Sequence, residues 1–335
     1  TTLFRSFFIL MPCYSPLKGW KDRETGGIIF KAQGPSSETM EVACGQCLGC
    51  RLDYSRHWAM RIIHESCLHE DNRGSCFITL TYRDAAACDE EQYRNGYFIP
   101  SDWSLNKKHF QDFMKRLRSR KGGLIRFFHC GEYGNKCRHG AVKECDLCNV
   151  GRPHYHAILF NIQFDDLEPF GRADDGRILY TSRDLEDIWK YGFVQVGDVT
   201  FESAAYVARY SLKKITGPTA EDHYKSYDEH GEWKSIQSEY VTMSRRPGIA
   251  KTWFDRYITD VFPRDECPIP GKGISKSVPR YYEKLLEADD PHMLEEIKEL
   301  RQVFMAAHAD DYTPERLHAR YQVKKRQSEM LNRSI

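Results

Sequence analysis

The chain has 335 residues, of which 41% are hydrophobic and 13% aromatic, and 49 Lys and Arg stand against 48 Asp and Glu, a formal net charge of +1. This is the composition of a globular protein with one large or two modest domains, and the aromatic content excludes disorder over most of the chain. No apolar run reaches the roughly 18 to 20 residues of a membrane span, and the near-neutral charge argues against a polycation mode of nucleic-acid binding.

The first ten residues precede the segment Met11-Pro-Cys-Tyr. The short apolar run at 4–11 is followed by no small-residue cleavage site, which is untypical of a secretory signal peptide. We therefore expect residues 1–10 to be an upstream extension before a natural start at Met11.

A first cysteine cluster follows in the segment Cys44-Gly-Gln-Cys47-Leu-Gly-Cys50. Closely spaced CxxC units turn their sulfurs toward one point, as a tetrahedral zinc site requires. A fourth ligand is needed, for which Cys13 is the nearest cysteine and His57 and His64 are alternatives. A redox CxxC and an iron–sulfur site stay open as interpretations, and all of these indicate a reducing compartment.

Hydrophobic spacing predicts a helix over 51–70 and a buried strand over 76–82. It then predicts a helix over 105–117, a strand over 124–129 and a turn at 131–134. Between 107 and 126 there are eight Lys or Arg against the single acid Asp112. They include Lys107, Lys108, Lys115, Arg116 and Arg118. Such a basic segment suits a phosphate backbone, although a solvated helix face is the alternative.

A second cysteine-rich cluster lies between 135 and 150. It consists of Cys137, His139, Cys145 and Cys148, which offer three thiolates and one imidazole within twelve residues. A complete set of four ligands at this spacing predicts a structural zinc ion.

The segment 154–162 is predicted to be a strand, with His154 and His156 on one face about 6–7 Å apart. Two imidazoles so placed can hold a divalent metal, whereas a lone His-x-His pair is often merely buried. A carboxylate just upstream, Glu132, would complete a three-ligand site with open positions for substrate oxygens.

The next predicted elements are a helix over 185–189, a strand over 193–199 and a helix over 202–214. On the last helix Tyr206, Tyr210 and Lys213 recur at i, i+4 and i+7, so that two phenols and one ammonium share a face. A core aromatic stripe with a snorkelling lysine is the alternative. Beside a metal, however, a phenol is a competent nucleophile toward a phosphodiester.

Residues 217–246 are polar and predicted to form loops, and helices are predicted over 253–261, 281–288, 293–307 and 315–333. The order β-α-β-β-α-β-α predicts an α+β fold, a sheet domain with ferredoxin-like connectivity and flanking helices. An N-terminal metal module and a helical C-terminal region frame it.

Three segments resemble motifs one, two and three of rolling-circle replication initiators, the His-hydrophobe-His endonucleases, in the same order and at similar spacing. They are Phe77-Ile-Thr-Leu-Thr-Tyr82, Gly151-Arg-Pro-His154-Tyr-His156-Ala-Ile-Leu-Phe160 and Tyr206-Val-Ala-Arg-Tyr210-Ser-Leu-Lys213-Lys214. The opening at Met11–Trp20, the first cysteine cluster and Ser244-Arg-Arg-Pro-Gly248 further resemble the replication initiation proteins of small single-stranded DNA phages, the gokushovirus branch of the Microviridae. The resemblance covers roughly residues 11–260.

The resemblance implies a metal-dependent nickase and strand transferase acting in the cytoplasm of a bacterial host. Tyr206 or Tyr210 would attack the origin phosphate, leaving a 5′-phosphotyrosine and a 3′-hydroxyl primer, and the second tyrosine would later rejoin the strand. His154, His156 and Glu132 would hold Mg²⁺ or Mn²⁺. Lys213, Lys214 and Arg152 would contact phosphate, and the basic helix the DNA backbone. Host polymerase and helicase are implied partners, besides single-stranded origin DNA.

The implied domains are a Cys-rich module over 11–75, an endonuclease domain over 76–260 and a helical region over 261–335. Between Glu132 and His154 the chain has 21 residues where the family has a short turn. We expect a zinc-stapled insertion there that restores the short span. The alternatives are a zinc-containing single-stranded-DNA-binding protein without catalysis, in which the tyrosines stack on bases, and a tyrosine transposase or relaxase.

Overall fold

The computed structural model describes residues 13–22, 27–31, 39–135, 150–173, 176–210, 214–215, 217–227 and 231–331. The chain divides into two compact units, one made of Thr1–His57 and Tyr257–Ile335, the other of Trp58–Arg256. The divisions fall within helices α1 (Leu48–Cys67) and α7 (Lys251–Val261). Among the described helices, none combines the length and the apolar character that crossing a membrane demands.

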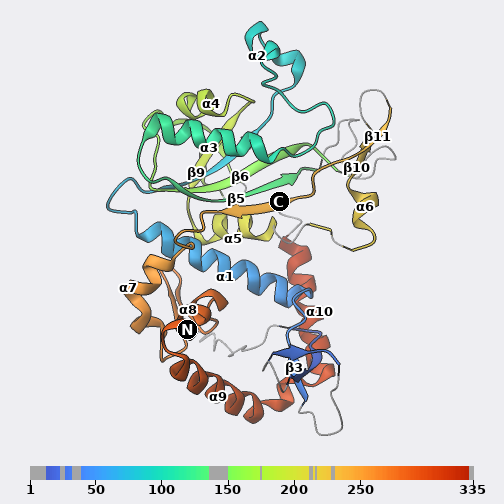
Figure 1. Ribbon diagram of the computed structural model, residues 1–335, viewed down its shortest axis with the longest axis vertical. Helices are drawn as coiled ribbons and strands as arrows, with labels where there is room; N and C mark the ends of the chain where they lie inside the picture. Colours follow the sequence, from blue (N-terminus) through green and yellow to red (C-terminus); the bar gives the residue numbers. More distant parts are fainter. Residues whose placement is uncertain are drawn as a thin grey trace. The chain divides into compact units, whose positions relative to one another are not determined.

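The larger unit is built on a mixed sheet-and-helix architecture, which confirms the α+β prediction (Figure 1). Its described strands form a seven-stranded antiparallel sheet in the order β12-β5-β6-β4-β9-β8-β7. The strands are β4 (Ser75–Thr81), β5 (Arg126–Tyr133), β6 (Pro153–Phe160), β7 (Glu168–Arg172), β8 (Ile178–Thr181), β9 (Val194–Asp198) and β12 (Tyr240–Met243).

The central strands β4, β5 and β6 are rich in β-branched and aromatic residues and almost wholly buried. Their register pairs His154 with both Thr81 and Glu132, and His156 with both Thr79 and Cys130. Because residues directly opposite each other on antiparallel strands share a face, this register decides which side chains meet.

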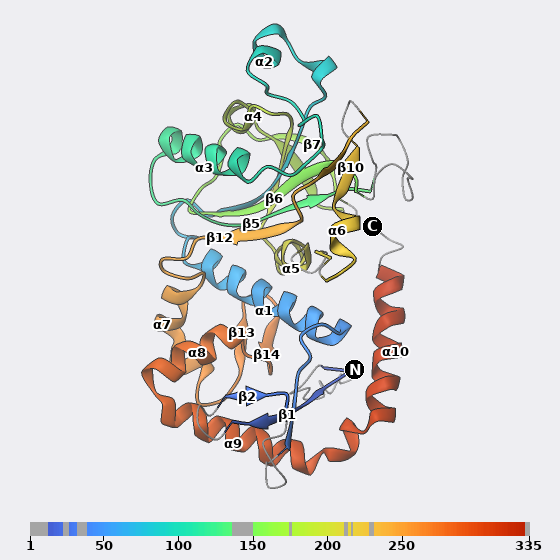
Figure 2. The same cartoon turned by 45° about the vertical axis from the view of Figure 1, so that its right-hand side comes forward.

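Helices cover both faces of the sheet (Figures 1 and 2). Helices α3 (Lys107–Lys121) and α4 (Arg183–Trp189) lie on one face, where apolar residues of α3 join Tyr155 and Leu159 in the main core. Helix α5 (Phe201–Tyr210) lies on the other face, against β5 and β6. The predicted order β-α-β-β-α-β-α is therefore present, with the hairpin β7–β8 inserted before α4.

Two local predictions are wrong. The turn expected at 131–134 is the end of β5, which stays paired through Tyr133; Gly131 is needed there because a Cβ would lie 2.9 Å from the Tyr240 ring. The segment expected to be loops over 217–246 contains α6 (Ala220–His223), the hairpin β10 (Lys225–Tyr227) and β11 (Trp233–Ser235), and β12. Strand β12 is polar, and it is held by pairing to β5 rather than by its own periodicity.

The helix expected over 202–214 ends earlier than its sequence suggested. Its described part, α5, ends at Tyr210, and Lys214 lies exposed outside any helix or strand. Residues 211–213, including Lys213, lie outside the described residues. A short capped helix α2 (Glu90–Arg94) follows β4 and a 3-10 turn at Ala85–Ala87.

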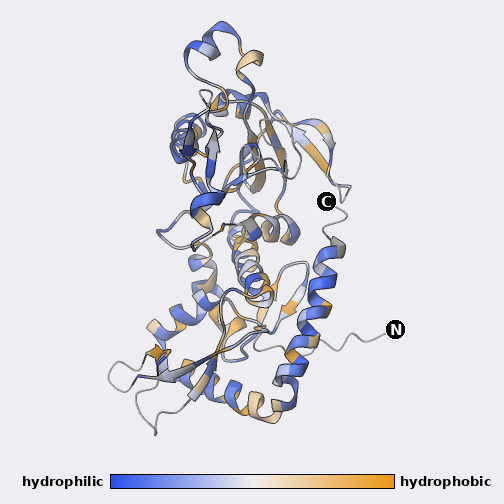
Figure 3. Cartoon of the chain, turned by 90° about the vertical axis from the view of Figure 1, so that its right-hand side faces the viewer, coloured by the Kyte–Doolittle hydropathy of each residue, from blue (hydrophilic) through white to orange (hydrophobic). Residues whose placement is uncertain are grey.

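The smaller unit contains a three-stranded antiparallel sheet in the order β2-β1-β3 and the hairpin β13–β14 among its described residues. The strands are β1 (Leu17–Lys21), β2 (Ile28–Ile29), β3 (Thr39–Val42), β13 (Cys267–Ile269) and β14 (Gly273–Ser275). Its helices α8 (Arg280–Asp289), α9 (Pro291–Ala307) and α10 (Pro314–Leu331), with a 3-10 turn at Ala309–Tyr312, lie where helices were expected. The surface of α10 is mostly hydrophilic (Figure 3).

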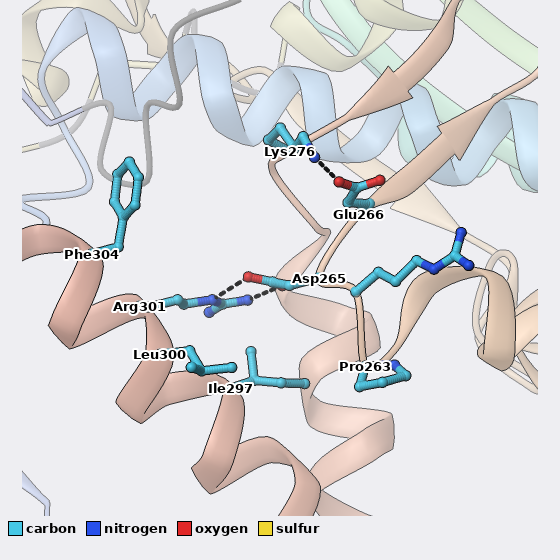
Figure 4. A pocket seen from close by; sticks show the side chains of 9 residues that line it. Pro263, Asp265, Glu266, Lys276, Ile297, Leu300, Arg301 and Phe304 are labelled. Atoms are coloured by element: carbon cyan, nitrogen blue, oxygen red, sulfur yellow. Dashed lines mark hydrogen bonds and ion pairs between the residues drawn. The ribbon is translucent and has the colours of Figure 1, made fainter.

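A charged pocket in the smaller unit holds α8 and α9 against the segment before β13 (Figure 4). Arg301 donates two hydrogen bonds to Asp265, at 2.6 and 2.7 Å, and one to Glu283 at 2.6 Å. Lys276 pairs with Glu266 on the same wall. These contacts satisfy the pocket's charges, so we assign it a structural role.

Candidate metal and nucleophile site

Three ligand-type side chains converge on one face of the central sheet. Glu132 of β5 lies opposite His154 of β6, and His156 follows on the same face. Glu132 Oε1 lies 2.5 Å from His154 Nε2 and 3.1 Å from His156 Nε2. Glu132 and His156 are buried, and the His154 side chain is 18% exposed, which opens the group on one side.

The hydrogen bonds of the two histidines turn both Nε2 atoms toward the carboxylate. His154 Nδ1 lies 3.1 Å from Arg152 O, a carbonyl that can only accept, so Nδ1 carries a proton. A neutral His154 then faces Glu132 with a lone pair on Nε2. Two lone pairs at this distance repel unless a cation lies between them, so the geometry suits a metal ion or a shared proton.

The charge of Glu132 is held by its two histidine neighbours. Burial raises the pKa of this carboxyl, but hydrogen bonds from His154 and His156 outweigh burial and lower the pKa to about 2. The group is therefore an anionic oxygen ligand with two imidazole nitrogens beside it, a donor set that fits a divalent ion. Such an ion would be held by Glu132, His154 and His156.

Residues of β4 support the triad from the next strand. Thr79 Oγ1 lies 2.9 Å from His156 Nδ1, so the hydroxyl fixes the ring and leaves Nε2 toward Glu132. The Phe77 ring stacks on the His156 imidazole with centroids 5.6 Å apart and planes 14° apart. Thr79 and Phe77 lie in the first motif, whose alternation placed them on this face, but the sequence analysis assigned them no role.

A tyrosine of α5 lies beside the triad. The ring centroid of Tyr206 is 5.4 Å from that of His156, edge to face, and 6.4 Å from that of Phe77. Tyr206 is half-buried, whereas Ser203, Ala204, Val207 and Ala208 on the other side of α5 are buried. Helix α5 begins close to the end of β9, and Ser203 caps it by accepting from the Thr200 N–H at 2.8 Å. The backbone of Tyr210 ends the helix one turn later.

The long segment between Glu132 and His154 starts and ends at one point. The Gly134 N–H donates to Arg152 O at 2.9 Å, and a Cβ on Gly151 would overlap with Gly134 O. The two glycines therefore touch, and the strand pairing closes as it would around a short turn. Cys137, His139, Cys145 and Cys148 lie within 136–149, outside the described residues.

The first cysteine cluster gathers four sulfurs in the smaller unit. Cys13, Cys44, Cys47 and Cys50 have Sγ atoms within 4.8 Å of one another. Cys44 and Cys50 are 4.0 Å apart, and Cys13 and Cys47 are 3.9 Å apart. Sulfurs about 2.3 Å from a tetrahedral zinc are about 3.8 Å apart, so the group fits such an ion.

Backbone N–H groups also point at these sulfurs. The amides of Tyr14 and Cys44 donate to Cys47 Sγ and Cys13 Sγ, each at 3.3 Å. Burial raises the pKa of the Cys47 thiol, but backbone donors from Cys50 and Tyr14 contribute to lowering it to about 7. Such donors stabilise thiolates, the form that binds metal.

The two histidines considered as a fourth ligand lie elsewhere. His57 contacts Ser277 at 2.8 Å and Asp53 at 3.4 Å. The His64 ring stacks on Trp253 with centroids 3.5 Å apart. The fourth sulfur near Cys44, Cys47 and Cys50 is that of Cys13.

The basic residues of α3 lie across the sheet from the triad and have partners within the chain. Lys108 and Lys115 pair with Asp112 at 2.6 and 3.3 Å. Arg116 donates to Ile188 O and Trp189 O, and Arg118 donates to Ile125 O. The Lys107 ammonium lies 4.9 Å from the Tyr240 ring centroid. A contact between α3 and DNA stays a prediction, but it would lie on the face away from Glu132 and His154.

Arg152 lies close to the triad but is also engaged. Its guanidinium donates to Asp84 at 2.7 Å and to Tyr82 O at 2.8 Å. It also lies over the Trp103 ring, 5.4 Å from the centroid. Its role toward DNA stays a prediction.

Fold and site together define an α+β protein with a two-histidine, one-carboxylate group beside a helical tyrosine. The family model for replication-associated proteins of the ORF2 type matches residues 75–215, a span that contains all of these residues. No solved structure matches the chain.

Three phage proteins are similar over most of the chain. The replication-associated protein VP4 of Bdellovibrio phage phiMH2K is 30% identical over 284 residues, covering 84% of this chain and 79% of that protein. The replication-associated protein ORF2 of Spiroplasma virus 4 is 31% identical, covering 78% and 73%. The replication-associated protein ORF4 of Chlamydia phage 1 is 29% identical, covering 73% and 53%. The chain belongs to this family of replication-associated proteins of Microviridae phages, as its sequence predicted. Its role is therefore in the replication of phage DNA.

Proposed function

We propose that the protein initiates rolling-circle replication by nicking single-stranded origin DNA with a tyrosine nucleophile. The observation that carries this proposal is the convergence of Glu132, His154 and His156 beside Tyr206. A binding protein would need neither the three ligands nor their position next to a phenol. The triad would hold Mn²⁺ or Mg²⁺, which would polarise the scissile phosphate and stabilise its charge.

The chain's own residues would carry the group transfer. The Tyr206 hydroxyl attacks the phosphorus, the bond to the 3′ oxygen breaks, and that oxygen leaves as a 3′-hydroxyl after taking up a proton. The 5′ phosphate stays on the tyrosine as a phosphodiester, so the bond is exchanged rather than hydrolysed. The 3′-hydroxyl primes synthesis. Tyr210, one turn along α5, would repeat the cut after one round and allow the first adduct to be joined into a circle.

The test uses oligonucleotides that tile the phage genome, each labelled at its 3′ end, with Mn²⁺ or Mg²⁺. Because the 3′ fragment carries the new 5′ phosphate, its label should migrate with the protein on a denaturing gel. Chelation by EDTA and the Tyr206→Phe/Tyr210→Phe double variant should abolish the transfer. Tyr93→Phe, which changes a tyrosine that is 63% exposed on α2, is the matched control and should retain it.

Two results would decide against this function. Retention of DNA on native gels with no cut or adduct over the whole genome, with either metal, would favour the non-catalytic binding protein. Transfer that persists in the double variant would exclude both tyrosines as nucleophiles. A tyrosine transposase or relaxase would form the same adduct but on DNA other than the phage origin.

We also propose that Cys13, Cys44, Cys47 and Cys50 hold a structural zinc ion. The sulfur separations and the amide donors support it. Metal analysis of purified protein should show that Cys13→Ser lowers the zinc content by about one ion per chain. Cys88→Ser, a half-buried cysteine away from the cluster, should not. Iron and labile sulfide in place of zinc would identify the iron–sulfur alternative.

A further inference from the structure

An exposed aromatic ring lies in the same row of the sheet as the triad. Phe193 and Thr81 exchange backbone hydrogen bonds of 2.9 and 3.1 Å. Thr81 in turn lies opposite His154, which lies opposite Glu132. Directly opposed residues share a face, so Phe193 projects from the triad's face. Two strand spacings put its Cα about 10 Å from that of His154.

The position of this ring is fixed by its backbone. A Cβ on Gly192 would overlap with Thr81 O and lie 2.5 Å from Arg83 N. The chain therefore approaches β4 too closely for any residue except glycine. Phe193 is nevertheless 57% exposed, although its neighbours Gly192 and Val194 are buried. A rigidly held, outward-facing phenyl ring is an uncommon surface feature beside a group of metal ligands.

A guanidinium lies beside the same ring. The Arg83 Cζ atom is 5.9 Å from the Phe193 ring centroid, near the limit of a cation–π contact. Its Nε is buried and has no hydrogen-bond acceptor within the part of the chain that the structure describes. The adjacent acid, Asp84, is engaged by Arg152. Arg83 thus differs from the basic residues of α3, whose charges are met within the chain.

We propose that Phe193 and Arg83 form a binding subsite for a single-stranded nucleotide that flanks the scissile phosphate. The base stacks on the exposed ring, and the guanidinium binds the adjoining phosphate. A base can offer its face to Phe193 only when it is unstacked and unpaired, so the subsite selects single-stranded over duplex DNA. Stacking is also sequence-tolerant, which leaves origin choice to other contacts. This inference rests on the proposed nicking function for the location of the scissile phosphate.

Binding of fluorescein-labelled oligothymidylate of about 16 nucleotides, followed by anisotropy, tests the stacking step. Phe193→Ala should raise the Kd for the single strand by about 5- to 100-fold, and Phe193→Trp should restore it. A duplex of the same length should bind wild type and Phe193→Ala within about twofold. The matched control is Phe170→Ala, because Phe170 is 65% exposed on β7 of the same sheet; it should leave both values unchanged.

The salt dependence of binding tests the phosphate contact. Arg83→Gln should reduce the slope of log Kd against log salt by about 0.7, the value for one contact with a single strand. Arg94→Gln, at an exposed arginine of α2 that pairs with Glu90, should leave the slope unchanged. Thermal unfolding of each variant checks that the fold is intact.

The outcomes separate this inference from the function on which it rests. Wild-type affinity for the single strand in Phe193→Ala, or equal losses in Phe170→Ala, would overturn the subsite even if wild type forms the covalent adduct. Where wild type forms the adduct, Phe193→Ala should raise KM for the oligonucleotide more than it lowers kcat. Loss of single-strand affinity in Phe193→Ala without any adduct in wild type would keep the ring as a DNA contact and reject the nickase.

Discussion

The two faces of the seven-stranded sheet both carry histidines and phenols, yet they use them differently. On the α3 face the His129 ring stacks on Phe110 with centroids 3.4 Å apart, and its Nδ1 bonds Thr242 at 2.9 Å. Burial lowers the pKa of His129 well below its usual range, so this ring is neutral. His109 on the same side bonds the Tyr82 hydroxyl at 2.8 Å.

On the α5 face the histidines meet a carboxylate instead of aromatic rings. His154 and His156 converge on Glu132, and the half-buried Tyr206 lies alongside. The difference teaches that residue type alone does not define a site here. Imidazoles packed among rings are structural, whereas imidazoles aligned by register on a buried carboxylate form a ligand set that needs a cation.

The largest expected effect comes from removing the charge at the centre of the α5 face. Glu132→Gln keeps the shape of the side chain but loses the anionic ligand, so metal-dependent adduct formation should fall by at least about 100-fold. Titration of the purified protein with Mn²⁺ should show a matching loss of affinity. Unchanged nicking would remove Glu132 from the ligand set and leave the two histidines to act without it.

A second charged group on the α5 face is already satisfied and should affect folding instead. Arg126 donates to Glu65 at 2.6 Å, and both are buried. Breaking such a pair leaves an uncompensated charge, so Arg126→Met should lower the free energy of unfolding by about 3–5 kcal/mol. Lys251→Met, at an exposed pair with Asp255, should change it by less than about 0.5 kcal/mol. Urea unfolding measures both.

The same pair gives an acid dependence with a defined sign. Burial raises the pKa of Glu65, but bonds from His69, the Ala250 N–H and Arg126 outweigh it and lower the pKa below its usual 4.5. The carboxylate therefore stabilises the fold fully above about pH 4.5, and this contribution is lost as the pH falls through the lowered value. Glu65→Gln should flatten that part of the stability profile; an unchanged acid limb would contradict the assignment.

Tyr155 separates the two faces within a single strand. It lies between His154 and His156 but points to the α3 face, where its hydroxyl bonds Tyr82 at 2.7 Å and accepts from the Asn106 N–H at 2.9 Å. Tyr155→Phe should cost about 1–3 kcal/mol of unfolding free energy because buried partners lose their bonds. Affinity for Mn²⁺ should stay within about twofold of wild type. A larger loss of metal affinity would show that the faces are coupled.

The sequence predicted the central strands and the face shared by His154 and His156 because both follow from local periodicity. Cys13 and Glu132 were also named, although their placement depends on pairing between distant segments. What local patterns could not supply is the edge of the sheet. Strands β7, β8 and β12 are short and polar, and their pairing partners hold them in place.

The subsite residues were missed for a related reason. Phe193 lies at the start of a predicted strand, and its alternation does not reveal whether the ring faces solvent or core. Only the register of β9 on β4 places it on the face of His154. The stacking of Phe77 on His156 likewise depends on two strands that are distant in sequence. Side chains that act through a neighbour become visible only when that neighbour is placed.

Thr79 gives the smallest and most specific test of the difference between the faces. Its hydroxyl is within hydrogen-bond distance of His156 Nδ1, at 2.9 Å, in a position equivalent to that of Thr242 beside His129 on the other face. If the first bond aligns a metal ligand, Thr79→Val should weaken Mn²⁺ binding about tenfold, and Thr79→Ser should restore it. Thr242→Val should lower stability by about 1–3 kcal/mol and leave Mn²⁺ affinity unchanged. Because both variants remove a threonine hydroxyl bonded to a histidine, equal effects on Mn²⁺ affinity would show that neither bond is specific to a metal site.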